Sequence, residues 1–268
     1  EAFTWNTPVV RGEMLAHRSS SDGKTGIAMF DGAQRKTVVS WRDENEATPF
    51  ISSHTLTKNS LLATTLRGEL IVFNVNPKAG KHFRFRTPTG KGIGAAPVVV
   101  DGRVYFGADD GYFYVLAHDG KLEPLSEENP LDVPRVKAPA KTSWPSTGGN
   151  PGNTSFVNDN DVKPALKVRW ATRGFGHFLA PCVATETELI SVTFGGIITC
   201  QDQATGRLIW RRQMPGPEWG TASGLLAADD RLYIPRPTFG RMEGAFHCLD
   251  LRDGKTLWSA DVGGRYIW

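Results

Sequence analysis

The stretch Asp202-Gln-Ala-Thr-Gly-Arg-Leu-Ile-Trp210 is matched further along the chain by Asp250-Leu-Arg-Asp-Gly-Lys-Thr-Leu-Trp258. In both copies a glycine stands between a polar run and an apolar segment that ends in tryptophan. Gly206 and Gly254 occupy the position at which a hairpin turn needs a positive φ, between two segments of strand-forming residues. The two copies therefore predict one β-hairpin that is used twice.

A second pattern, a turn followed by a short apolar strand, occurs five times and gives the chain a period. The copies align on Gly12, Asn59, Gly102, Thr187 and Asp230. The steps between them are 47, 43, 85 and 43 residues, and we interpret the step of 85 as close to two periods of 43. Self-similarity at such a length is the signature of a repeat architecture.

Each repeat has the same internal order of strands. An apolar first strand, such as residues 95–100, precedes the turn and the second strand. A glycine-containing turn then leads to a third strand, such as residues 195–201, and a short fourth strand ends in tryptophan. Four antiparallel strands in each period are typical of a propeller blade. The sequence therefore predicts an all-β fold, a β-propeller of four-stranded antiparallel blades.

Composition and charge narrow the class of protein further. With 40% hydrophobic and 22% charged residues, the 268-residue chain can support a packed core. No stretch approaches the roughly 18 apolar residues that span a bilayer, so no transmembrane segment is expected. The net charge is only +3 and the basic residues are scattered, with Arg207, Arg211 and Arg212 nearest to a cluster. We therefore expect no binding to nucleic acid.

The three cysteines, Cys182, Cys200 and Cys248, are widely spaced in the sequence. Cys182 and Cys200 could pair only if their strands are neighbours, and the odd number leaves at least one thiol over. We interpret the cysteines as small buried hydrophobic residues.

Residues 121–143 differ from the rest of the chain. They contain four prolines, alternating charges and few large apolar residues, which is typical of extended and solvated backbone. We interpret this stretch as a linker or insertion. It divides the chain into residues 1–120, with about three blades, and residues 144–268, with two to three more blades of what we expect to be the same propeller.

The repeated segment resembles the PQQ-like propeller repeat, which occurs in quinoprotein dehydrogenases and in the outer-membrane assembly factor BamB. The matching feature is the signature D-x-x-T-G-x-x-x-W, which stands here at Asp202 to Trp210, and with Asp253 in place of threonine in the second copy. In that family the tryptophan lies between adjacent blades and docks onto the glycine turn of its neighbour. The resemblance implies these structural docking residues: Trp41, Trp170, Trp210, Trp258, Gly206 and Gly254.

A second resemblance lies in the middle of the chain. Residues 144–154, which read Trp-Pro-Ser-Thr-Gly-Gly-Asn-Pro-Gly-Asn-Thr, are similar to the segment that opens many PQQ-like domains. Either a blade has been rebuilt by an insertion, or a second repeat array begins at about residue 142. Propellers of this family usually have seven or eight blades and both ends of the chain look cut, so the resemblance implies a partial or truncated propeller.

Three residues are candidates for a site at the central channel or the rim. His177 could act as a base, ligand or hydrogen-bond donor, although a histidine at the start of a strand more often bonds to backbone. Trp219 could stack on a planar ring, although packing at the start of a blade is the commoner role. Arg236, together with Arg241, could hold an anion or an acidic partner, although solvated arginines are the default there.

The residues of a PQQ-dependent dehydrogenase do not stand out in this sequence. The resemblance would require adjacent cysteines, a Ca²⁺ ligand set of Glu, Asn and Asp, and a catalytic Asp. The sequence has no adjacent cysteines, and the spacing of Asn74, Asp110 and Glu218 does not mark one oxygen-rich site. It also contains no GxSxG, HExxH or P-loop motif. We therefore expect no catalytic residue, metal or cofactor, with PQQ and Ca²⁺ entering only under the alternative below.

These observations favour a non-catalytic scaffold that binds a protein partner through its rim loops or a blade edge. One alternative is a fragment of a PQQ-dependent dehydrogenase, and a second is a ligand- or carbohydrate-binding sensor module. The family works mostly outside the cytoplasm of bacteria, so the resemblance implies a periplasmic or otherwise extracytoplasmic location.

Overall fold

The structure, a computed structural model, describes residues 8–21, 24–42, 54–76, 83–118, 144–146, 149, 155–156, 162, 166–174, 176–178, 180–214, 224–237 and 244–261. Within these residues all regular elements are strands, which form five four-stranded antiparallel sheets. In each sheet the strands pair in chain order. The predicted all-β fold of four-stranded antiparallel blades is confirmed.

The five sheets are called blades 1 to 5 in chain order. Blades 1 and 2 comprise β1 (Val9–Arg11), β2 (Met14–Ser21), β3 (Lys24–Asp31), β4 (Lys36–Arg42), β5 (Thr55–Leu56), β6 (Ser60–Thr64), β7 (Glu69–Asn74) and β8 (Phe83–Arg86). Blade 3 comprises β9 (Val98–Val100), β10 (Arg103–Gly107), β11 (Tyr112–Ala117) and β12 (Lys167–Arg173). Blades 4 and 5 comprise β13 (Val183–Ala184), β14 (Glu188–Val192), β15 (Ile197–Asp202), β16 (Leu208–Gln213), β17 (Leu226–Ala228), β18 (Arg231–Pro237), β19 (Gly244–Asp250) and β20 (Thr256–Asp261).

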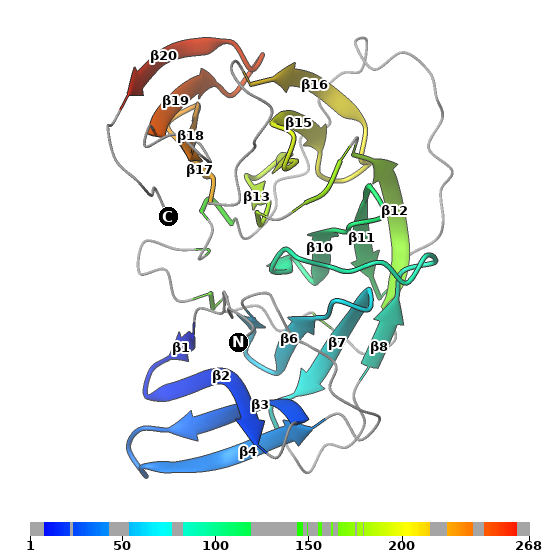
Figure 1. Cartoon of the computed structure of the whole chain (residues 1–268), viewed down its shortest axis with the longest axis vertical. Helices are drawn as coiled ribbons and strands as arrows, with labels where there is room; N and C mark the ends of the chain where they lie inside the picture. Colours follow the sequence, from blue (N-terminus) through cyan, green and yellow to red (C-terminus); the bar gives the residue numbers. More distant parts are fainter. Residues whose placement is uncertain are drawn as a thin grey trace.

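The blades follow one another around an arc (Figure 1). The first strand of each blade lies toward the common centre, and the fourth strand lies on the outside. This order follows from composition, because the inner strands are short and apolar. The three valines of β9 are fully buried, whereas half-buried Phe and exposed Arg alternate along the outer strand β8.

The tryptophans of blades 3, 4 and 5 lie within the outer strands, each of which continues for three residues beyond its tryptophan, and a recurring irregularity orients them. In blades 3, 4 and 5 the register between the third and fourth strands shifts by a β-bulge directly beside the tryptophan. The residues beside the bulge pair as Val115 with Trp170, Cys200 with Trp210 and Cys248 with Trp258. A bulge re-aims a side chain and increases local twist, so each indole is turned in the same way relative to its sheet.

Blade 3 corrects our interpretation of the 85-residue step. β12 pairs with β11 in the same sheet, so the chain leaves the blade after Ala117 and returns to it at Lys167. The step from Gly102 to Thr187 therefore covers one blade with a long connection between its third and fourth strands, and not two periods. Residues 167–173, which include the predicted docking residue Trp170, form the fourth strand of this blade. A boundary drawn at residues 120 and 144 passes through blade 3, and residues 121–143 lie outside the described residues.

Candidate functional sites at the blade seams, the axis and one loop face

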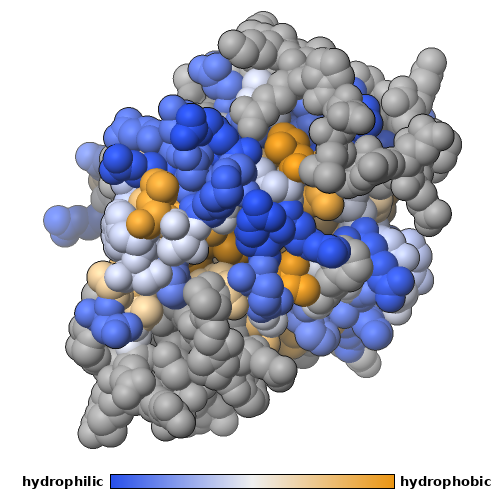
Figure 2. Space-filling model, turned by 90° about the horizontal axis from the view of Figure 1, so that it is seen from above, coloured by the Kyte–Doolittle hydropathy of each residue, from blue (hydrophilic) through white to orange (hydrophobic). Residues whose placement is uncertain are grey.

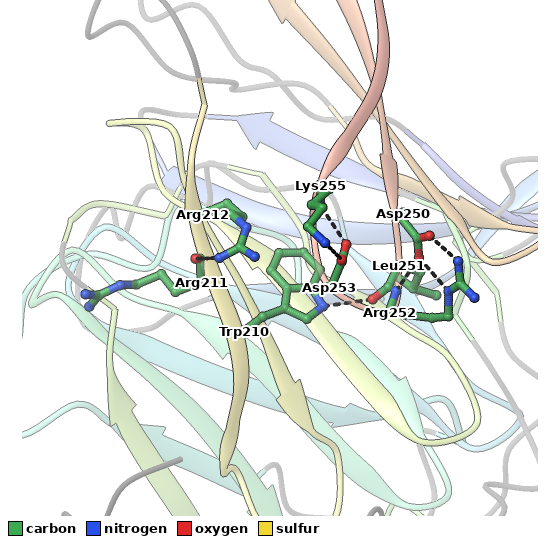
Figure 3. Close-up of polar contacts among 8 residues, drawn as sticks. All are labelled: Trp210, Arg211, Arg212, Asp250, Leu251, Arg252, Asp253 and Lys255. Atoms are coloured by element: carbon green, nitrogen blue, oxygen red, sulfur yellow. Dashed lines mark hydrogen bonds and ion pairs between the residues drawn. The ribbon is translucent and has the colours of Figure 1, made fainter. Parts of the chain in front are cut away.

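The seam between blades 4 and 5 is built around Trp210 (Figure 3). The Trp210 side chain is buried, and its Nε1 donates a hydrogen bond of 2.8 Å to the carbonyl oxygen of Leu251 in the turn of blade 5. Gly254 in the same turn has a φ of 71°, and a Cβ atom there would lie 2.6 Å from the indole ring. Only glycine meets both conditions, since other residues rarely adopt this φ and would collide with the ring.

Ion pairs surround this contact on the surface of the blade 5 turn (Figure 3). The Arg252 guanidinium lies 2.5 Å from a carboxylate oxygen of Asp250, and the Lys255 ammonium lies 2.7 Å from Asp253. The hydrogen bond from Arg252 lowers the pKa of Asp250 to about 2. Exposed pairs contribute little to stability, so we assign them to shaping the turn that receives the tryptophan.

The seam between blades 3 and 4 repeats this geometry with Trp170. Gly206 has a φ of 75°, and a Cβ atom there would lie 2.6 Å from the Trp170 ring. Arg169, next to the tryptophan, donates from Nε to the carbonyl oxygen of Ala204 at 3.4 Å. The buried Trp170 Nε1 has no hydrogen-bond partner among the described residues.

The other two predicted docking residues lie in different surroundings. Trp41 is buried, with its ring centroid 5.1 Å from that of Phe73 in blade 2. Trp258 on β20 is 45% exposed and lies beside Tyr233 of its own blade, with ring centroids 6.2 Å apart. The structure thus brings Trp170 and Trp210 onto glycine turns of the next blade. A stabilising role for these contacts stays a prediction.

Part of the long connection in blade 3 lies against the innermost strands of other blades. The backbones of Trp144 and Ala184 exchange hydrogen bonds of 2.8 and 2.9 Å, which extends blade 4 past β13. The carbonyl oxygen of Pro145 accepts a hydrogen bond of 2.7 Å from Ala227 of β17, and Ser146 bridges Leu226. Three consecutive residues therefore line the inner edges of both blades 4 and 5.

The same connection also reaches blade 2. Leu56 of β5 donates a backbone hydrogen bond of 2.9 Å to Ser155, and Phe156 packs with the core of blades 1 and 2. The Arg11 guanidinium of β1 lies 5.8 Å from the centroid of the Phe156 ring. We call residues 144–146, 149 and 155–156 the axial segment, because the strands that they contact surround the centre of the arc (Figure 1). Sequence reasoning missed this placement.

Trp144 anchors the axial segment in a buried cluster between blades 3 and 4. It is 1% exposed and shares this cluster with Tyr105, Trp170 and Phe178. Gly149 has a φ of 77° and lies against the Trp144 ring. A Cβ atom added at this position would lie only 2.8 Å from the ring. Burial raises the pKa of Tyr105 to about 12.

All three cysteines are buried thiols. Cys182 lies in the same cluster as Trp144, and burial raises the pKa of its thiol, which makes the reactive thiolate form scarce.

His177 lies where two blades meet on one face of the propeller. Its Nδ1 is 3.6 Å from a carboxylate oxygen of Asp109 in the β10–β11 turn, and the imidazole is 67% exposed. Its carbonyl oxygen accepts a hydrogen bond of 2.7 Å from Phe194 in the β14–β15 turn. Burial is the largest effect on Asp109 and raises the pKa of its carboxyl group, which the neighbouring His177 opposes. The backbone of His177 is thus bonded to the next turn, while its exposed imidazole faces the Asp109 carboxylate.

The other two candidates cannot be joined to His177. Trp219 lies outside the described residues, as does Arg241. Arg236 is placed by its backbone in β18, opposite Ala245, while its side chain lies outside the described part. Where the structure is described, no group of three or more His, Cys, Asp or Glu residues could hold a metal ion. The same residues include no helix of the length and apolarity that a membrane crossing requires.

Comparisons with known proteins agree with this fold and its repeat. Residues 167–267, which cover blade 4, blade 5 and the last strand of blade 3, match the family described as outer membrane protein assembly factor BamB. The predicted PQQ-like, BamB-like repeat is confirmed over these residues. No curated protein matches the sequence.

Solved structures extend the likeness of fold to nearly the whole chain. BamB from Moraxella catarrhalis matches with a TM-score of 0.61 and 13% identity over 95% of this chain and 61% of that one. The computationally designed Ika8 protein matches with a TM-score of 0.61 and 11% identity, over 94% and 60%. A chain of a mitotic checkpoint complex matches with a TM-score of 0.60 and 9% identity, over 94% and 61%. This chain thus spans about three fifths of the length of the structures that it matches.

Proposed function

We propose that the chain is a non-catalytic, extracytoplasmic propeller scaffold that binds a protein partner through its rim loops or a blade edge. The observation that carries the proposal is the match of residues 167–267 to a family described as an outer membrane protein assembly factor. An assembly factor holds other proteins, and a propeller offers many loops on a rigid frame for that task. In this proposal, Trp170 and Trp210 keep the frame rigid by joining neighbouring blades.

The face that carries His177 is the best candidate among the loops. On this face, backbone hydrogen bonds join hairpin turns to the connections between blades. Phe194 donates to His177 at 2.7 Å, and Asp109 donates to Gly92 at 2.8 Å. Leu66, in the β6–β7 turn at the same end of the blades, is 45% exposed. A fixed surface with an exposed apolar residue and an imidazole–carboxylate pair suits recognition of a protein surface.

The axial segment supports binding at the surface rather than in the channel. A cofactor at the centre of the arc would have to share space with chain segments that already bond to β5, β13 and β17. The proposal therefore places recognition on the loops or edges, and it treats the dehydrogenase and sensor functions as outcomes of the test.

Site-specific photo-cross-linking in cells of the source organism tests the proposal. The cross-linking residue is placed at Leu66, with Lys58 as the matched control, because the two positions lie at opposite ends of β6. We expect a discrete protein adduct from position 66, weakened by His177→Ala, and none from position 58. Equal labelling at both positions, or no adduct from either, would contradict the proposal.

Ligand binding gives the complementary test. Tight binding of added PQQ with Ca²⁺, together with dye-linked oxidation of alcohols or sugars, would replace the scaffold by the dehydrogenase alternative. Saturable calorimetric binding of a soluble sugar, without a protein adduct, would replace it by the sensor module. The scaffold predicts neither signal.

A further inference from the structure

The outer strands of three consecutive blades carry an unbalanced charge. β8, β12 and β16 contain only basic charged residues, namely Arg84, Arg86, Lys167, Arg169, Arg173, Arg211 and Arg212. The whole chain has a net charge of only +3. The scattered basic residues of the sequence are therefore gathered by the fold, because positions far apart in the chain become neighbours on the outside of the arc. We call these seven residues the basic rim.

The basic rim lies on sheet edges. β8, β12 and β16 are each the last strand of their sheet, and they follow one another along the outside of the arc (Figure 1). Six of the seven side chains are exposed, and Arg169 is half-buried. In the view onto blades 4 and 5 from the outside, hydrophilic side chains dominate the described surface and hydrophobic ones form small separate spots (Figure 2).

Part of this charge already serves the fold. Arg84 pairs with Glu69 of the adjacent strand at 3.1 Å, and Arg169 bonds to the blade 4 turn. Arg86 and Arg173, by contrast, lie on the exposed side of strands whose apolar residues turn inward. These two arginines on neighbouring blades give the rim an outward positive charge.

We propose that the basic rim is the docking surface for an extended acidic segment of a partner protein. The inference rests on the scaffold function and names the chemistry of its partner. Six of the seven residues are arginine, whose planar fork binds carboxylates through two parallel hydrogen bonds. The outer strands also present backbone groups to which an extended peptide can add as a further strand.

Other anionic partners fit the rim less well. Single-stranded nucleic acid needs several exposed aromatic rings for base stacking, but Trp170 and Trp210 are buried and the phenylalanines of β8 are half-buried. Tyr112 of β11, opposite Arg173, is 41% exposed, and one ring does not make a platform for successive bases. A flat membrane would meet one blade of a curved arc at a time. Edge strands also carry charged residues, above all lysine, to prevent aggregation, whereas six of the seven rim residues are arginine.

Binding of a fluorescein-labelled glutamate-rich peptide of about 12 residues, long enough for two outer strands, tests the inference by anisotropy. The rim variant is Arg86→Glu/Arg173→Glu. Its control is Arg35→Glu/Lys58→Glu, which makes the same change of net charge at exposed turn residues outside the basic rim and outside the face that carries His177. We expect the Kd to rise about tenfold in the rim variant and less than about twofold in the control. The charge-conserving Arg86→Lys/Arg173→Lys variant should fall between them, because it keeps the charge and loses the fork.

Four outcomes would overturn the inference. Two concern the peptide: it does not bind, or the rim variant and its control weaken its binding equally. Two concern other partners: the protein floats with phosphatidylglycerol vesicles in a rim-dependent way, or its rim binds single-stranded DNA in preference to the peptide. A protein adduct at position 66 that survives the rim variant would refute the rim and leave the scaffold intact. Loss of every adduct, with peptide binding retained, would refute the scaffold function alone.

Discussion

The two seams on either side of blade 4 use the same pair of residues and differ in what surrounds them. In the seam with blade 5, the Trp210 indole lies on Gly254 and its N–H is bonded to Leu251. In the seam with blade 3, the Trp170 indole lies on Gly206, and within the described chain its N–H is left without a partner. The Trp144 indole of the axial segment also packs in this seam, and its N–H likewise has no hydrogen-bond partner among the described residues.

The difference shows that the shared sequence signature determines the packing of the indole on the glycine. It does not determine whether the indole N–H forms a hydrogen bond. Apolar packing dominates both seams, because a buried indole removes about 150–250 Å² from water. The seam between blades 3 and 4 contains more aromatic side chains than the other seam, and fewer of its indole N–H groups are hydrogen-bonded. Variants at matching positions should separate these two contributions.

The largest effect is expected from removing an indole. Trp210→Ala and Trp170→Ala should each lower the free energy of unfolding by about 3–5 kcal/mol, because each leaves a cavity in a seam. Urea denaturation followed by tryptophan fluorescence and circular dichroism measures the loss. A cost below about 1 kcal/mol at either position would contradict a packing role.

Trp144→Ala should cost as much as Trp210→Ala. A Trp144 that lay on the surface would cost less, but it is 1% exposed in the cluster between blades 3 and 4. The same urea titration gives the comparison. A loss of only a few tenths of a kcal/mol, as at ordinary surface positions, would remove Trp144 from this seam.

The next largest effect is expected from filling the space under the ring. Gly254→Ala and Gly206→Ala should each cost about 2–4 kcal/mol, from the strain of a positive φ and the collision with the indole. Gly111→Ala is the matched control, because it has a φ of 83° and open space around the added atom. It should show only the strain of about 1–2 kcal/mol. Equal losses at all three positions would mean that the indoles are not in contact with the turns.

A smaller effect should distinguish the two seams directly. Trp210→Phe loses a hydrogen bond that Trp170→Phe does not, so its cost should be larger by about 1 kcal/mol. The difference in unfolding free energy between the two variants measures this term. Equal costs would show that the bond to Leu251 contributes nothing net.

The last effect is confined to alkaline pH and vanishes near neutral pH. Burial raises the pKa of Tyr105 to about 12 from an ordinary value of 10.0, so the folded chain keeps a proton that the unfolded chain releases. Stability should therefore fall as the pH rises from about 10 to 12, and be unaffected by this group below that range. Tyr105→Phe should flatten the slope of unfolding free energy against pH. An unchanged slope would show that this tyrosine does not titrate late.

The repeated pattern made the blades predictable, because it alternates turns with short apolar strands and each blade is built from local hairpins. The positive φ of Gly206 and Gly254 was predictable from the hairpin turn that each glycine occupies. The indole that packs on each glycine was expected only from the family resemblance. The placement of the axial segment was not predictable, because it depends on pairing with strands that are far away in the chain. The 85-residue step could not be interpreted from the sequence alone, because a long connection inside one blade lengthens the chain by as much as a second blade would.

The basic rim was hidden from sequence reasoning in another way. Arg86 and Arg173 are separated in the sequence by the first three strands of blade 3 and the long connection, so no window of residues reveals them together. The link between His177 and Asp109 has the same origin, since it joins the start of one blade to a turn of another. Local signals thus predicted the elements, and contacts between blades needed the structure.

The route of the connection inside blade 3 has a consequence for how the chain folds. Its 49 residues between Ala117 and Lys167 must be traversed before β12 can complete the blade, which costs about 2 kcal/mol more in closure entropy than a five-residue connection. The pairing of Leu56 with Phe156 adds another contact between distant residues. Long-range contacts slow folding, so blades 4 and 5 are expected to gain protection from hydrogen exchange before blade 3 does.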